Sequence, residues 1–267
     1  MRLVIEPLCL RLRQPFVIAH GASTTRENVL VRLVEGNASA GGGEGGALEG
    51  VGEAAAVPYL GESRAGITAY LEALAATGPE LDPLTFAHVI DALPPGSAAA
   101  RAAVDIALHD ACGKALGAPL YRLFGLRPEL PPSSFTIAIG TPEEMARAAR
   151  AAPLPVLKLK LGAGGEALDL ARVAAVRGAS ALPIRVDANA GWSRESAERL
   201  LPRLAELGVE LCEQPLAAGD REGLRTLSRL SRRPALFADE SIRSSADIVA
   251  HAGLVEGVVI KLAKSGG

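Results

Sequence analysis

Hydrophobic and polar residues follow one pattern in the first part of the chain and another in the second. In the first part, the alternation within residues 3–12 and 28–34 predicts strands of an antiparallel sheet. Apolar residues at helical spacing predict three helices, at 61–78, 83–93 and 97–116. From about Pro132, short apolar runs alternate with segments rich in Ala, Leu, Arg and Glu. This alternation predicts a parallel sheet with right-handed helical crossovers.

The second part contains six predicted strands, at 135–139, 155–161, 183–188, 210–214, 235–240 and 257–262. The predicted helices lie at 142–152, 166–177, 193–207, 220–229 and 244–251. A closed β/α barrel needs about eight strands, and an open arc of six would leave two strand edges in water. We therefore expect an incomplete barrel and a chain that lacks about its last quarter.

Two segments of the first part are predicted to be irregular. Residues 19–27 are small and polar, which predicts a mobile loop. Residues 36–50 are rich in glycine, which predicts the tip of a hairpin before residues 51–59 return the chain to the sheet.

Composition excludes several classes of partner. The net charge of the 267 residues is −2 without a basic block, which gives no support for nucleic acid or an anionic membrane as partner. The N-terminus lacks the apolar stretch of a signal peptide, and no apolar run reaches spanning length. Cys9, Cys112 and Cys212 are scattered without metal-type spacing, so we expect reduced core residues of a cytoplasmic protein.

Three carboxylates end three of the predicted strands. Asp187, Glu213 and Asp239 are evenly spaced, each 26 positions after the one before it. The carboxyl ends of barrel strands form the face where active sites are built. Hard oxygen ligands suit Mg²⁺, and no His or Cys accompanies them as zinc would require. For each acid singly, the alternative is a cap on the following helix.

Lysines occupy the neighbouring strand ends. Lys158 and Lys160 lie two apart on one strand, so both point to the same side, away from the leucines between them. Their proximity should lower the pKa of one of them, as a lysine base needs. The alternative is a solvated strand end with extended lysines. Lys261 is expected as the sole charge on its buried strand, and Lys264 as either a surface residue or a ligand contact.

Several short motifs together resemble the enolase superfamily, in its muconate-lactonizing subgroup. They are KLK, VDANAGW, CEQP, ADES and IKLAKSGG in the second part, and VGEAA and AAVDIALHDACGKALGAPLYRLFG in the first. The resemblance extends from about Leu3 to Gly267. It implies an α/β fold in which an N-terminal α+β capping domain, residues 1–125, covers a modified TIM-type (β/α) barrel, residues 126–267.

The resemblance also implies a chemistry. In that family Mg²⁺ binds a substrate carboxylate, a lysine removes the proton alpha to it, and an enediolate intermediate forms. The implied metal ligands are Asp187, Glu213 and Asp239. Lys160 and Lys261 would be the acid/base pair, with Lys158 neutralising the carboxylate. The implied orienting residues are Asn189, Gln214 and Glu240, although Asn189 and Gln214 could merely support turns.

Within the family, FTIAIGTPEEM and IKLAKSGG resemble dipeptide epimerases of the L-Ala-D/L-Glu type. Thr136 would then touch the substrate, or be a β-branched strand residue only. His20 and Arg26 of the predicted loop would set specificity, or be ordinary surface residues. Ala190 stands where many epimerases carry Gln. An Asp-x-Asp motif that receives the dipeptide's ammonium group would lie beyond Gly267.

Together with the resemblance, these observations predict a Mg²⁺-dependent isomerase, a racemase or epimerase that acts on a small carboxylate substrate, with a dipeptide favoured, expected as a cytoplasmic homo-oligomer. The alternatives are an o-succinylbenzoate synthase-like dehydratase and a muconate cycloisomerase. A non-enzymatic alternative is an inactive remnant that only binds a ligand, although the intact acids and lysines speak against decay.

Overall fold

The computed structural model describes residues 1–35 and 47–267, which form two compact units. The N-terminal unit comprises Met1–Arg11, Thr25–Leu130 and Lys261–Gly267. The barrel unit comprises Leu12–Thr24 and Pro131–Ile260. Most of the predicted hairpin tip at 36–50 lies outside the described residues. The division into domains at residue 125 stays a prediction.

The first sheet has the strand order β1-β2-β3 and is built from β1 (Arg2–Ile18), β2 (Gly21–Val34) and β3 (Glu49–Ala54). β2 and β3 pair antiparallel, as the alternation predicts. The predicted loop at 19–27 is wrong, because only a two-residue turn separates β1 from β2. Thr24 and Thr25 are β-branched residues that favour strands, and this preference outweighs the small polar composition of the segment.

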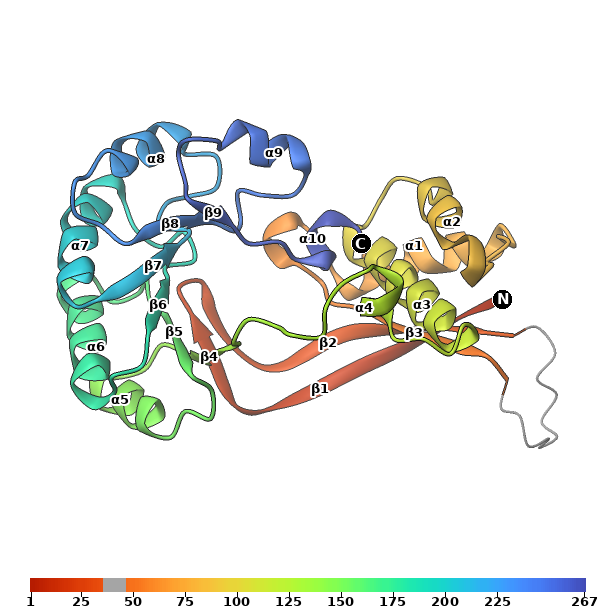
Figure 1. Ribbon diagram of the computed structural model, residues 1–267, viewed down its shortest axis with the longest axis horizontal. Coiled ribbons are helices and arrows are strands. Elements are labelled where there is room, and N and C mark those ends of the chain that lie inside the picture. Colours follow the sequence, from red (N-terminus) through yellow and green to blue (C-terminus); the bar gives the residue numbers. More distant parts are fainter. Residues whose placement is uncertain (36–46) are drawn as a thin grey trace. The chain divides into compact units, whose positions relative to one another are not determined.

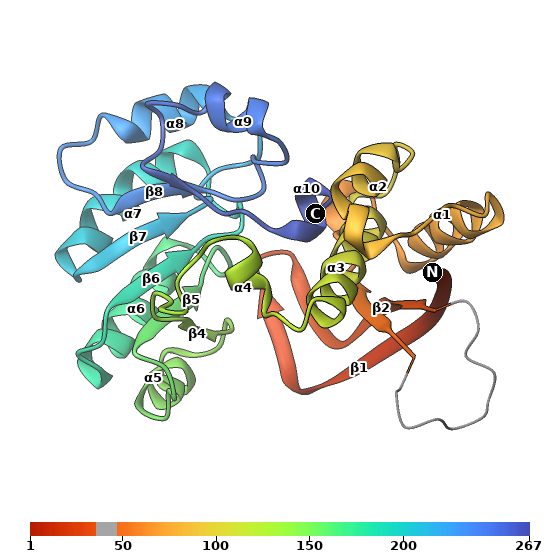
Figure 2. The same ribbon diagram turned by 45° about the vertical axis from the view of Figure 1, so that its right-hand side comes forward.

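Helices cover this sheet. They are η1 (Pro58–Leu60), α1 (Arg64–Ala76), η2 (Pro83–Thr85), α2 (Phe86–Ala92), α3 (Ala98–Ala115) and α4 (Leu120–Leu123). Figures 1 and 2 show α3 lying beside the strands, and its contacts run along β3. The approach to β3 is so close that a Cβ on Gly52 would lie 2.0 Å from the carbonyl oxygen of Ala103. Gly50 meets Ala107 in the same way. Small residues on both elements therefore fix this packing, which explains the VGEAA and Ala-rich motifs.

The second sheet contains the six predicted strands, all parallel and in sequence order. They are β4 (Ser134–Ile137), β5 (Val156–Lys160), β6 (Ile184–Asp187), β7 (Val209–Glu213), β8 (Ala235–Ala238) and β9 (Gly257–Val258). The intervening helices are α5 (Pro142–Arg150), α6 (Glu166–Ala179), α7 (Arg194–Glu206), α8 (Arg221–Ser228) and α9 (Ser245–Ala250). Helices α6–α8 line the outer face of the sheet (Figure 1). This arrangement is the β/α barrel architecture that the sequence predicts.

Local signals start these helices where the strands end. Thr141 and Glu144 form a capping box on α5, and Ser193 and Asp220 cap α7 and α8 through their side chains. The core lies between sheet and helices. Its buried residues include Leu157, Leu159, Val173, Val176, Leu200 and Leu204. The leucines of β5 thus face the helices, as predicted, and its two lysines face the other side.

The last predicted strand is shorter than expected. β9 ends at Val258, and Lys261 is an exposed residue that precedes α10 (Leu262–Ser265) in the N-terminal unit. Lys261 is therefore not a buried strand residue. As the last strand in the sheet order, β9 is supported by β8 alone, and the chain leaves it early. Lys264, on α10, is buried.

The three cysteines were expected in the core. Cys112 and Cys212 are buried free thiols, but Cys9 is exposed, so its assignment to the core is wrong.

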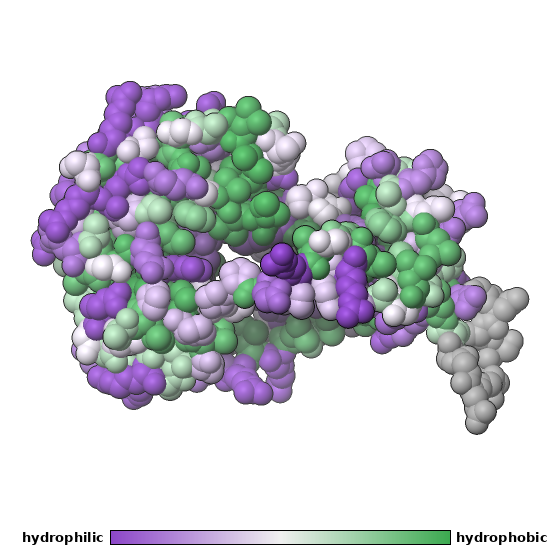
Figure 3. Space-filling model, in the orientation of Figure 1, coloured by the Kyte–Doolittle hydropathy of each residue, from purple (hydrophilic) through white to green (hydrophobic). Residues whose placement is uncertain are grey.

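Hydrophobic surface gathers over α9, where Ile248 and Val249 are exposed (Figure 3). None of the helices among the described residues is long and apolar enough to cross a membrane.

Candidate metal centre

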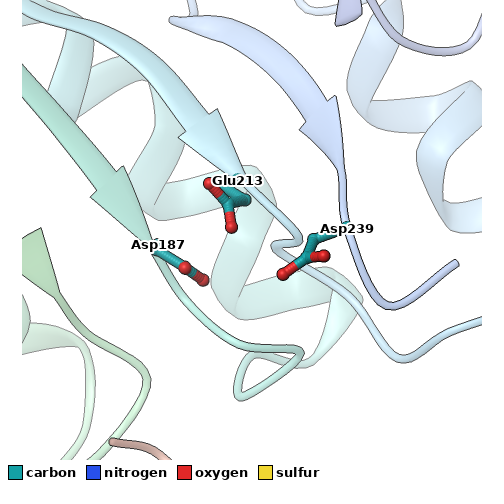
Figure 4. A group of neighbouring side chains, drawn as sticks. All are labelled: Asp187, Glu213 and Asp239. Carbon is teal, nitrogen blue, oxygen red and sulfur yellow. The ribbon is translucent and has the colours of Figure 1, made fainter. Parts of the chain in front are cut away.

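The three predicted carboxylates come together at the carboxyl ends of three adjacent strands. Asp187 ends β6, Glu213 ends β7, and Asp239 directly follows β8. Each offers an oxygen within 4.8 Å of the others, and all three side chains are buried. They point into the same space (Figure 4). Parallel pairing puts Asp187 level with Glu213, which is why spacing along the chain becomes proximity in space.

Both lysines of β5 reach this group. The ammonium group of Lys158 lies 2.6 Å from Oε2 of Glu213 and 2.9 Å from Oδ2 of Asp187. Lys160 donates to the same Asp187 oxygen at 2.6 Å and to Oδ1 of Asn189 at 3.1 Å. Side chains two apart on a strand share a face, so this geometry follows from the KLK motif.

Burial and charge shift the pKa values of these groups. Burial, followed by the charge of Asp187, raises the pKa of Glu213 to about 8. Burial also acts to raise the pKa of Asp187, but Lys158 and Lys160 outweigh it and bring the value to about 2. Burial lowers the pKa of Lys158, whereas Asp187 and Glu213 raise it, and the net shift is upward. The lowering that we expected for one lysine is therefore wrong for Lys158, because it contacts two carboxylates.

The residues fit a hard divalent cation. Three carboxylates in one buried group carry more negative charge than the interior tolerates without a counter-ion, which the raised pKa of Glu213 reflects. Oε1 of Glu213 is buried without a hydrogen-bond partner among the described residues. The ammonium group of Lys158 already bridges two of the three acids, as a cation would. An all-oxygen donor set is the one that Mg²⁺ prefers.

The predicted orienting residues hold the backbone around these acids. Oε1 of Gln214 accepts from the N–H groups of Asp239 at 2.9 Å and Ser241 at 3.2 Å. Nδ2 of Asn189 donates to Oε1 of buried Glu240 at 3.1 Å, and the Asn189 N–H donates to Asp187 at 2.9 Å. These contacts support an orienting role, which stays a prediction.

Backbone strain accumulates at the same place. Asn189, Ala190 and Gln214 adopt positive φ values of 44°, 60° and 38°, which residues with a side chain rarely do. Each lies within three residues of a candidate ligand. Strained backbone of this kind clusters at functional sites, where the surrounding structure over-determines it.

The other predicted site residues are placed differently. His20, in the turn between β1 and β2, has Nε2 2.6 Å from the carbonyl oxygen of Asn189. Thr136 lies on β4 level with Lys158 and lines a hollow of about 760 Å³ that Phe16 and Met145 also border. Arg26, exposed on β2, belongs to the N-terminal unit together with Lys261 and Lys264. The roles of all five residues stay predictions.

Sequence reasoning missed a buried polar cluster beside this site. Asp169 and Arg172 on α6 form an ion pair at 2.8 Å, and Trp192 donates its indole N–H to Asp169 at 2.9 Å. The available signal was the i,i+3 spacing of opposite charges on the inner face of a helix. Surface helices show the same spacing, so the signal alone could not separate the two cases.

Both parts of the chain match models of known protein families. Residues 3–125 match the family model for the N-terminal domain of mandelate racemase and muconate lactonizing enzyme, and residues 141–267 match the model described as enolase C-terminal domain-like. The chain therefore belongs to the enolase superfamily, as the motifs predict.

Within that superfamily, individual relatives resemble the whole chain. An L-Ala-D/L-Glu epimerase of Bacteroides thetaiotaomicron is 36% identical across 100% of this chain and 68% of its own length. The structure of a dipeptide epimerase from Enterococcus faecalis V583, complexed with Mg and the dipeptide L-Leu-L-Tyr, superimposes with a TM-score of 0.89 at 29% identity, covering 100% of this chain and 75% of that one. A muconate lactonizing enzyme from Pseudomonas fluorescens, complexed with muconolactone, gives 0.86 at 28% identity, covering 100% and 73%.

Proposed function

We propose that this protein is a Mg²⁺-dependent epimerase that inverts the alpha carbon of a dipeptide. The observation that supports this most directly is the contact of Lys158 and Lys160 with a buried group of three carboxylates. That arrangement sets a base beside a cation site, which is the requirement for removing a proton alpha to a carboxylate. The epimerases among the relatives make a dipeptide the favoured substrate.

In this proposal Asp187, Glu213 and Asp239 hold the metal ion. Bound Mg²⁺ supplies positive charge that stabilises the negative charge developing on the substrate carboxylate. Lys160 removes the alpha proton of one stereoisomer, and Lys261 delivers a proton to the opposite face. In the reverse direction they exchange roles. Lys158 offsets the substrate's negative charge, and Asn189 holds the Lys160 ammonium group between its carboxamide and Asp187.

A deuterium-exchange screen tests the reaction class. The purified protein with Mg²⁺ is incubated in D₂O with a dipeptide library, and alpha-proton loss is followed by mass spectrometry. We expect exchange in a subset of dipeptides, with inversion of one residue. Turnover of a cyclohexadiene carboxylate without exchange in any dipeptide would favour the dehydratase instead.

The two lysines provide a sharper test. Lys160→Ala should still exchange the alpha proton of one isomer, and Lys261→Ala that of the other. Each variant should lose net epimerisation by roughly 10²–10⁴-fold, the usual contribution of a positioned acid or base. If one lysine supports exchange of both isomers, the two-base mechanism is wrong.

A muconate cycloisomerase is the second candidate, supported by the likeness to the muconate lactonizing enzyme. It needs only one base, and muconate consumption in the presence of Mg²⁺ or Mn²⁺ would identify it. The inactive remnant would show neither exchange nor turnover.

The cellular setting belongs to the same proposal. We infer a cytoplasmic enzyme, because all three cysteines of the described residues are free thiols. We also infer a homo-oligomer, for which the exposed apolar side chains of Leu126 and Leu130 are candidate contacts. Analytical ultracentrifugation would measure the oligomeric state.

A further inference from the structure

A buried ion pair on α6 contacts three of the loops that follow the barrel strands. Asp169 is 1% exposed and Arg172 6% exposed. Charges so deeply buried are costly unless every polar atom is satisfied. Here Trp192 is the third member, and we call Asp169, Arg172 and Trp192 the α6 clamp. The metal centre described above uses none of them.

The contacts of the α6 clamp fall on three different loops. Oδ2 of Asp169 accepts from the N–H of Gly162, after β5, at 2.9 Å and from the indole of Trp192, after β6, at 2.9 Å. Arg172 donates to the carbonyl oxygen of Gly140, after β4, at 2.9 Å, and to that of Ala163. One ion pair thus connects the loops after β4, β5 and β6.

Two of these loops lie next to residues with a proposed role in the reaction. Gly162 lies two residues after Lys160, and Trp192 lies three residues after Asn189, to which the Lys160 ammonium group donates. The loops also touch directly, since a Cβ added to Gly191 would lie 2.6 Å from the carbonyl oxygen of Gly162. A displacement of Gly162 must therefore move the segment that follows Asp187.

The opposite end of α6 offers a comparison. Arg177 donates to the carbonyl oxygens of Leu182 and Leu207 at 3.0 Å each and of Gly208 at 3.1 Å. These carbonyls precede β6 and β7, at the amino ends of the strands. In β/α barrels that end contributes stability, whereas the carboxyl end contributes the active site. Arg177 is thus a partly buried arginine of the same helix whose hydrogen bonds go to the opposite ends of the strands from Lys160 and Asp187.

We propose that the α6 clamp is a positioning device that fixes Lys160 and Asp187 relative to each other through the loops after β5 and β6. The clamp residues do not touch the carboxylates of the metal centre in any contact described above. They act through Gly162 and through the segment from Asn189 to Trp192. The catalytic part of this inference rests on the proposed function, whereas its effect on the metal centre does not.

The test compares Trp192→Phe, Arg172→Met and the matched control Arg177→Met. Trp192→Phe removes one hydrogen-bond donor and keeps the ring. We expect kcat for alpha-proton exchange to fall about 10-fold in Trp192→Phe and about 100-fold in Arg172→Met, with KM changed less, because small misplacements of reacting groups have effects of this size. Arg177→Met should also lower the melting temperature, though less than Arg172→Met because it leaves no buried carboxylate without its ion-pair partner, and should keep kcat within about twofold.

A second readout is independent of substrate. The Mg²⁺ concentration that gives half of the maximal thermal stabilisation should rise about 10-fold in Arg172→Met, the usual effect of losing support behind metal ligands, and stay unchanged in Arg177→Met. Two results would overturn the proposal. One is an equal loss of kcat and of Mg²⁺ response in the two arginine variants, and the other is a wild-type kcat and Mg²⁺ response in Trp192→Phe. If Arg172→Met does not fold, Trp192→Phe alone decides. A wild-type protein that exchanges no dipeptide proton refutes the proposed function, while the Mg²⁺ response still decides the clamp.

Discussion

The two compact units differ in how many polar side chains they bury: among the described residues, the N-terminal unit buries Asn28, Asp105 and Lys264, whereas the barrel unit buries nine. In the N-terminal unit the closest packing is between small apolar residues: Gly50 and Gly52 of β3 lie against the backbone of Ala107 and Ala103 of α3. In the barrel unit, carboxylates, amides and an ion pair are buried around the carboxyl ends of β5–β8. Burying polar groups destabilises a fold unless they are paired, so their concentration in one place indicates a functional requirement. The comparison teaches where substitutions should affect activity and where they should affect stability.

The largest effect should come from the metal centre. Replacing Asp187 or Asp239 by Asn, or Glu213 by Gln, should reduce exchange activity by about 10³-fold or more, because the metal contributes several kcal/mol to the transition state. The Mg²⁺ dependence should disappear with it. Folding should survive in Glu213→Gln, because burial and Asp187 oppose the charge of Glu213, whereas Asp187→Asn should lose some stability with its two lysine contacts. Activity and circular dichroism measure the two outcomes. Glu166→Gln, at a half-buried acid paired with Arg199, is the control and should keep full activity. Full activity of a ligand variant at low Mg²⁺ would show that its assignment is wrong.

The converse effect is expected in the N-terminal unit. Gly52→Ala places a methyl group against the Ala103 carbonyl and should lower the free energy of unfolding by about 3 kcal/mol, the upper range for overpacking. Denaturant titration measures this loss. Gly66→Ala, at an exposed position of helix α1 in the same unit, should instead stabilise by about 0.5–1 kcal/mol. A neutral Gly52→Ala would mean that α3 can move away from β3 without cost.

The response to pH should distinguish the metal centre from ordinary packing. The pKa of Glu213 in the metal-free protein is raised to about 8, so the native state favours its protonated form. Its contribution to stability therefore falls as pH rises from the ordinary glutamate value toward 8. Mg²⁺ needs the carboxylate form, so its apparent affinity should weaken up to about tenfold for each pH unit below 8.

Thermal melts in a Mg²⁺ titration at about pH 6.5 and about pH 8.5 measure this difference, which spans the raised pKa. We expect a lower midpoint concentration at the higher pH. Glu213→Gln removes the titrating group, so any residual Mg²⁺ response should be less pH-dependent. Identical midpoints for the wild type at both pH values would contradict the prediction.

The smallest effect concerns the strained backbone. Ala190 has a φ of 60°, where glycine is favoured over alanine by about 1 kcal/mol. Ala190→Gly should therefore raise stability by up to about 1 kcal/mol. Ala188→Gly, at a buried position of the same segment with ordinary φ, should lower it. If Ala190→Gly is less stable than the wild type, the packing of the Ala190 methyl group contributes more to stability than the backbone strain costs.

The acids and the lysine pair could be predicted because each depends on local periodicity. An apolar strand that ends in Asp187 or Glu213 places its last side chain at the loop face, and parallel pairing makes these positions level. The same reasoning failed at Lys261, because the length of an edge strand depends on a neighbour on one side only. It failed at residues 19–27, where pairing between β1 and β2 outweighed a loop-like composition.

The α6 clamp could not be predicted for a different reason. Asp169, Gly162 and Trp192 meet only when α6 lies against two loops, and each residue alone is ordinary. Even the contact between Gly162 and Gly191 depends on the folded conformation of both loops. Tertiary hydrogen bonding of this kind leaves no periodic trace in a single sequence.

The long hairpin of β1 and β2 has a consequence for how the protein is made. Its tip, Leu12–Thr24, belongs to the barrel unit, while both strand stems belong to the N-terminal unit. His20 meets the carbonyl of Asn189, which the ribosome adds 169 residues later. Closing so large a loop is slow, and the tip must wait until β6 has formed. The tip is thus synthesised well before the segment that it contacts, and during that interval it is open to chaperones and proteases.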